Sequence, residues 1–130
     1  IPVGAVLILD EKIIGKGRNQ SIELNDPSAH AEIQALREGG SKIGNYRLSG
    51  SKIYVTVEPC TMCVGAMVHA RIEKLVFGAK EPKSGAVAST SDILRQSSFN
   101  HRFEVLDGVL KDECARLMTN FFRARRKERC

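Results

Sequence analysis

The chain has 130 residues and a formal net charge of +5, and 42% of its residues are hydrophobic and 27% charged. This length suits one domain with its own core, and this balance excludes a disordered chain. No apolar run approaches the roughly 18 residues of a membrane span, and no secretory segment opens the sequence. We therefore expect a globular protein without a membrane span, located by default in the cytoplasm.

Apolar periodicity predicts eight elements in the order strand, strand, helix, strand, helix, strand, strand, helix. The expected strands cover residues 3–9, 13–17, 53–57, 75–77 and 103–106, and the expected helices cover 29–38, 61–70 and 112–126. Ser28 is expected to cap the first helix, and Gly39-Gly40 to end it. Residues 18–28 and 80–100 are polar connections, with one helical turn expected near Ile93. This order predicts an α/β fold with helices layered on a mostly mixed sheet.

Two expected junctions between a strand and a helix carry unusual residues. His30 and Glu32 open the first helix, and Cys60 and Cys63 flank the start of the second. Two cysteines separated by two residues at a helix start can face one metal, and the positive helix end lowers thiol pKa values. Each motif is weak alone, since His-x-Glu occurs by chance and Cys-x-x-Cys also serves redox or structural zinc sites. Their combination on matching junctions favours a metal centre.

The number of candidate ligands distinguishes a catalytic from a structural zinc site. Three protein ligands leave zinc an open position for water, whereas a structural site has four. The remaining histidines and cysteines are His69, His101, Cys114 and Cys130, and none is well placed as a fourth ligand. Glu32 is then the natural proton carrier. Residues two apart do not share a helix face, so Glu32 and His30 must converge in the first turn.

His-x-Glu with Pro-Cys-x-x-Cys is the signature of the zinc-dependent nucleobase deaminases. Over nearly its whole length the chain resembles the bacterial tRNA-specific adenosine deaminases of the cytidine-deaminase-like superfamily. The matching stretches are residues 2–6, 25–32, 45–48, 54–63 and 121–123. The resemblance implies a single CMP/dCMP-type deaminase domain over residues 1–130, with a three-layer α/β/α architecture and a central mixed sheet of about five strands.

The resemblance also implies the activity and the roles of the site residues. The implied reaction is hydrolytic deamination of adenosine to inosine at the wobble position of tRNA, by a zinc-activated water. His30, Cys60 and Cys63 would hold one Zn²⁺ per subunit, and Glu32 would shuttle the proton. The family forms homodimers in which both subunits hold the tRNA anticodon loop, and we expect the same here.

Substrate contacts are implied less firmly by the resemblance. Asn19 resembles the family's base- and ribose-contacting asparagine, although it also suits a turn. Asn100 and Phe122 are candidates for contacts to the anticodon loop, although Phe122 equally suits core packing. The sequence departs from the family at Glu81, where Asp is common. It also begins at the first strand, and we expect the family's preceding amphipathic helix in a longer natural chain.

Two alternatives to tRNA editing stay open at this point. One is a deaminase of free guanine, cytosine or cytidine, and the other is a non-catalytic zinc-binding RNA module. Residues 116–130 contain six basic residues and one acidic residue. These charges suit either a patch that contacts RNA phosphates or a solvated helix end.

Overall fold

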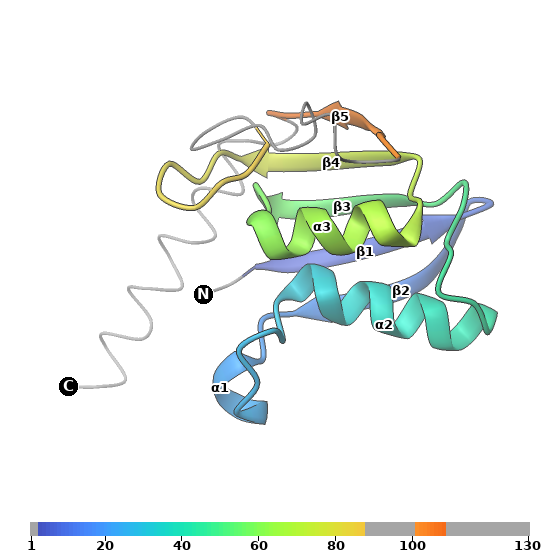
Figure 1. Ribbon diagram of the computed structural model, residues 1–130, viewed down its shortest axis with the longest axis horizontal. Helices are drawn as coiled ribbons and strands as arrows, with labels where there is room; N and C mark the ends of the chain where they lie inside the picture. The colour runs from blue at the N-terminus through green and yellow to red at the C-terminus, as the bar shows by residue number, and fades with distance from the viewer. Residues whose placement is uncertain (1–2, 88–100, 109–130) are drawn as a thin grey trace.

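A five-stranded mixed sheet covered by two long helices makes up the part of the chain that the structure describes, residues 3–87 and 101–108 of a computed structural model (Figure 1). The elements are β1 (Gly4–Leu9), β2 (Lys12–Arg18), α1 (Ser21–Leu24), α2 (Ala31–Ile43), β3 (Lys52–Val57), α3 (Thr61–Ala70), β4 (Lys74–Ala79) and β5 (Glu104–Leu106). No helix among these residues is long and apolar enough to cross a membrane.

The sheet has the strand order β2-β1-β3-β4-β5. β1 runs antiparallel to both β2 and β3, whereas β3, β4 and β5 are parallel. The β1–β2 hairpin turns at Asp10 and Glu11, whose φ angles of 51° and 64° are left-handed. A two-residue hairpin turn needs this conformation to match the twist of the strands.

Helices α2 and α3 lie on the same face of the sheet (Figure 1). α2 connects β2 to β3, and α3 connects β3 to β4. Because β2, β3 and β4 all point the same way, both helices begin at the carboxyl edge of these strands, on the left in Figure 1. The core between helices and sheet includes Leu7, Ile53, Met67, Leu75 and Phe77, each with none of its surface exposed.

Two glycines let helix α2 pack directly against strand β2. A Cβ atom at Gly15 would lie 2.2 Å from the carbonyl oxygen of Ala35, and one at Gly17 would lie 2.0 Å from that of Ala31. No side chain fits at either position, so these two glycines determine how closely the first two turns of α2 approach β2.

The predicted order of strands and the helix over residues 61–70 are confirmed. The boundaries of the first long helix were wrong: it begins at Ala31 and runs to Ile43, with His30 and not Ser28 at the N-cap. Gly39 and Gly40 lie inside it, and the helix ends at Gly44 with φ of 76°. Gly39 is retained in the helix because it packs on Leu7, whose Cδ2 would lie 2.5 Å from a Cβ there.

The predicted connection over residues 18–28 is also not wholly irregular, because it contains the short helix α1. The helix expected over 112–126 and the turn expected near Ile93 lie outside the described residues.

Candidate active site

The topology brings the two junctions predicted from the sequence to one edge of the sheet. β2 leads through α1 to the start of α2, and β3 leads directly to the start of α3. His30 is the N-cap residue of α2, and Cys60 is the N-cap residue of α3. Cys63 follows one turn later and is completely buried. The structure thus brings together the three predicted ligands from segments 30 residues apart.

Their ligand atoms form a nearly equilateral triangle. The Nδ1 atom of His30 lies 3.6 Å from Cys60 Sγ and 3.5 Å from Cys63 Sγ, and the two sulfurs are 3.7 Å apart. A tetrahedral zinc ion, with bonds of about 2.3 Å to sulfur and about 2.0 Å to nitrogen, separates two sulfurs by about 3.8 Å and a sulfur from a nitrogen by about 3.5 Å. The three residues therefore fit a zinc ion.

Among the residues that the structure describes, this is the one group of His, Cys, Asp and Glu side chains suited to a metal, and it has three members. His69 is exposed near the end of α3. His101 lies elsewhere, with its Nε2 atom 2.7 Å from the carbonyl oxygen of Ile72. Cys114 and Cys130 lie outside the described residues. A three-ligand group is typical of a zinc site that keeps a position open for water.

Both N-cap side chains face the triangle. Neither His30 nor Cys60 forms a side-chain cap hydrogen bond. The positive ends of two helix dipoles consequently point toward the same place, which favours thiolate and other anions there.

The protonation of the two cysteines is coupled through their contact. Its hydrogen bond with Cys63 lowers the pKa of Cys60 to about 5, and nearby His30 contributes in the same direction. The same hydrogen bond, together with burial, raises the pKa of Cys63. The contact therefore favours a single thiolate in the pair.

Glu32 lies in the first turn of α2 and is only 4% exposed. Burial raises the pKa of its carboxyl, while a hydrogen bond with its own backbone and one with Cys63 oppose that rise. The required convergence with His30 is possible because His30 has an extended backbone, with φ of −74° and ψ of 157°. His30 therefore precedes the helix, and the rule that residues two apart do not share a helix face does not apply to His30 and Glu32.

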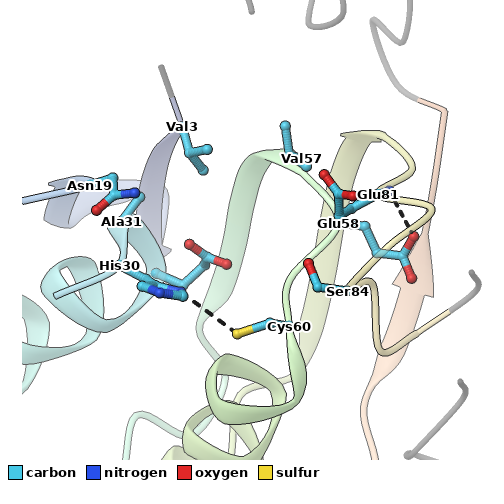
Figure 2. A pocket seen from close by; sticks show the side chains of 10 residues that line it. Val3, Asn19, His30, Ala31, Val57, Glu58, Cys60, Glu81 and Ser84 are labelled. Carbon is cyan, nitrogen blue, oxygen red and sulfur yellow. Dashed lines mark hydrogen bonds between the residues drawn. The ribbon is translucent and has the colours of Figure 1, made fainter. Parts of the chain in front are cut away.

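His30, Glu32 and Cys60 line a pocket of about 170 Å³ at the carboxyl edge of the sheet (Figure 2). Asn19, which directly follows β2, is one of its lining residues. Its Oδ1 atom also accepts a hydrogen bond of 3.1 Å from the backbone N–H of Ser21, so it serves the turn as well. Asn100 and Phe122 lie outside the described residues.

Apart from Glu81, where the sequence departs from the family, the residues of the opposite wall of this pocket were not among those singled out from the sequence. That wall contains Val57 and Glu58 at the end of β3, and Glu81 and Ser84 in the loop after β4. One sequence signal was available for Glu58, an acidic residue placed between a buried strand and Pro59. Its burial depends on a loop more than twenty residues away along the chain.

Comparisons with known proteins agree with this geometry. The sequence model of the MafB19-like deaminase family matches residues 1–126. A tRNA-specific adenosine deaminase of Haemophilus influenzae is 53% identical over 130 residues, which cover 99% of this chain and 75% of that protein.

Two solved structures are also similar. One, from a study of A-to-I editing by deaminases at the wobble position of transfer RNA, has a TM-score of 0.86 and 44% identity, over 88% of this chain and 83% of that one. Guanine deaminase from Bacillus subtilis has a TM-score of 0.60 and 29% identity, over 90% of this chain and 77% of that one. Its fold, its three-residue metal group and its sequence relatives thus place the chain in the family of tRNA-specific adenosine deaminases, among the MafB19-like deaminases.

Proposed function

We propose that this protein hydrolytically deaminates adenosine to inosine at the wobble position of tRNA. The observation that carries the proposal is the triangle of His30, Cys60 and Cys63 with the Glu32 carboxyl buried beside it, in a chain of this family. An enzyme that reacts with a nucleobase must take that base out of its stack into a pocket of its own. A pocket of about 170 Å³ is of a size to hold a single base.

His30, Cys60 and Cys63 are proposed to hold one Zn²⁺ per subunit, on the strength of the distances between their ligand atoms. When bound, zinc supplies Lewis-acid activation of water at neutral pH. The lowered pKa of Cys60 favours a thiolate that would bind a cation, and the two helix N-termini would stabilise the negative charge that develops during hydrolysis.

Glu32 is the proposed proton shuttle. A carboxylate beside the reacting water accepts its proton, and the same carboxyl then donates a proton to the amine that leaves C6 of adenine. Burial supports this role because it raises the pKa of Glu32 and makes its carboxylate a stronger base than an exposed one. Asn19, on the pocket wall, is proposed to orient the base and ribose.

The substrate is proposed to be the tRNA anticodon loop, whose bases are already splayed from the stack. Asn100 and Phe122 are proposed to contact that loop, and the basic residues of 116–130 to contact its phosphates. A homodimer located in the cytoplasm, with both subunits holding the loop, completes the proposal, by analogy with the family.

The likeness to a guanine deaminase favours a second candidate, deamination of free bases or nucleosides. The protein, supplied with zinc, is incubated with a transcribed arginine tRNA and, separately, with guanine, adenosine and cytidine. The matched control is the same transcript with guanosine at the wobble position. Inosine formed in the first transcript alone supports the proposal, whereas turnover of the free compounds alone contradicts it. RNA binding without either product would indicate a non-catalytic module.

A further inference from the structure

The segment that leads from β3 to Cys60 is tied by its backbone to the loop of residues 80–87 that follows β4. The N–H of Glu58 donates a hydrogen bond of 2.8 Å to the carbonyl oxygen of Ala79. The N–H of Ala86 donates one of 3.0 Å to the carbonyl oxygen of Pro59. The loop therefore starts and ends beside the residues that precede Cys60.

The side chain of Glu58 joins the two ends of the same loop. This carboxylate is 4% exposed. Its Oε1 atom accepts a hydrogen bond of 3.2 Å from the N–H of Glu81, drawn in Figure 2, and its Oε2 atom accepts one of 3.0 Å from the N–H of Val87. Each oxygen thus has its own backbone donor, an arrangement that only a carboxylate provides, because an amide side chain has one acceptor oxygen.

Gly85 shows how closely the loop lies on this carboxylate. A Cβ atom at residue 85 would lie 2.4 to 2.6 Å from the Cδ, Oε1 and Oε2 atoms of Glu58. The N–H of Gly85 also donates a hydrogen bond of 2.9 Å to the carbonyl oxygen of Glu81, which closes the loop on itself. The loop backbone is therefore packed around the carboxylate, with no space for another side chain.

The loop supplies Glu81 and Ser84 to the pocket wall opposite Asn19 and His30 (Figure 2). We propose that Glu58 is a positioning residue, which holds loop 80–87 as a fixed wall of the pocket and so determines how tightly the nucleic-acid substrate is bound. This role in binding rests on the proposed function, whereas the attachment of the loop does not.

The variant Glu58→Gln tests the proposal with little change in side-chain volume. Its amide nitrogen would face a backbone N–H, so one loop amide would lose its acceptor. We expect amide hydrogen exchange at Glu81 or Val87 to become roughly ten- to a hundredfold faster, with the amides of α2 and the bound zinc unchanged. The KM for tRNA should rise about tenfold and kcat should change much less.

Glu73→Gln is the matched control, because Glu73 is an exposed glutamate just before β4 and its replacement should leave both measurements unchanged. Gly85→Ala tests the same contact from the loop side and should also accelerate exchange over residues 80–87. Unchanged exchange in both variants would overturn the proposal, as would a fall in kcat with an unchanged KM. The exchange measurement needs no substrate, so a wild-type protein that leaves tRNA unmodified would overturn the proposed function instead.

Discussion

His30 and Cys60 occupy the first positions of two helices, where Ser, Thr, Asp or Asn usually accepts a hydrogen bond from the helix backbone. Neither side chain does so here, because both face the same candidate metal position. A missing cap typically costs about 1 kcal/mol. Two uncapped helix starts at one place are the kind of local exception that marks a functional site.

Glu32→Gln should separate proton transfer from metal binding. The substitution preserves the side-chain volume of a residue that is 4% exposed, and it removes the carboxyl group that exchanges the proton. We expect kcat to fall about 10²- to 10⁴-fold, with zinc content and fold retained. Glu38→Gln, an exposed change on the same helix, is the control. Single-turnover deamination of tRNA measures the effect, and a rate near that of the wild type would exclude Glu32 as the shuttle.

Cys60→Ala should instead remove the metal. Two ligands bind zinc far less tightly than three, and the ion links the starts of α2 and α3, so stability should fall with it. We expect the variant to lose its zinc and its activity, and to melt at the same temperature with or without a chelator. Met62→Ala changes an exposed neighbour in the same motif and should keep the chelator response of the wild type. Metal analysis and thermal unfolding provide the readout; full zinc content in Cys60→Ala would refute its role as a ligand.

At the scale of elements, the sequence predicted periodic segments better than their ends. Strand β3 alternates buried Ile53, Val55 and Val57 with exposed Tyr54, as its pattern predicts. The end of α2 could not be predicted, because a glycine such as Gly39 usually marks a helix end. It stays inside a helix where a neighbouring side chain occupies the space that its own side chain would fill. Leu7, on a strand distant in sequence, is that neighbour.

The close packing of α2 on β2 predicts that Gly17→Ala is destabilising. Its new Cβ would collide with the backbone of Ala31, next to His30, and a helix backbone cannot move aside as a side chain can. We expect a loss of about 1–3 kcal/mol in the free energy of unfolding, together with weaker zinc binding. Gly4→Ala in β1 is the control, because a Cβ there meets nothing within 4 Å. Urea unfolding measures both, and equal stability of the two variants would contradict the packing argument.

The turn that leads into α2 predicts a pH dependence. The Ser28 hydroxyl and N–H donate hydrogen bonds of 2.7 and 2.9 Å to Asp26, and these bonds lower the pKa of Asp26 below its ordinary value of 3.8. Since the folded pKa is the lower one, ionised Asp26 stabilises the fold above pH 3.8, and this contribution disappears as the pH falls through the folded pKa.

Asp26→Asn should therefore be less stable than the wild type near neutral pH, and the difference should vanish in strong acid. Thermal unfolding across this range tests the expectation. Asp107→Asn is the control, an exposed aspartate that forms a weak ion pair of 3.8 Å with Lys80. A difference that persists unchanged into acid would show that the side chain's charge is not responsible.

At the scale of the whole molecule, the candidate site draws on the ends of β2, β3 and β4 and the start of β1, because all of them meet at one edge of the sheet. The metal group could be predicted from the sequence, since His and Cys are rare and their spacing is restricted by helix geometry. Glu58 could not, because an acidic residue before Pro59 resembles a surface residue until the loop of 80–87 is placed over it.

A site for a tRNA loop also needs a surface for the rest of the tRNA, and the basic residues of 116–130 are the sequence's strongest candidates. If Arg125, Arg126 and Lys127 contact phosphates, replacing all three with Ala should weaken tRNA binding and reduce the slope of log K against log salt by about one for each lost contact. The control replaces Lys12, Lys52 and Lys74, which begin β2, β3 and β4 at the edge opposite the site. That variant also loses three positive charges. It therefore distinguishes contacts made by residues 125–127 from a general loss of positive charge on the protein. Binding titrations at several salt concentrations measure both slopes, and equal slopes would make the basic segment a solvated surface.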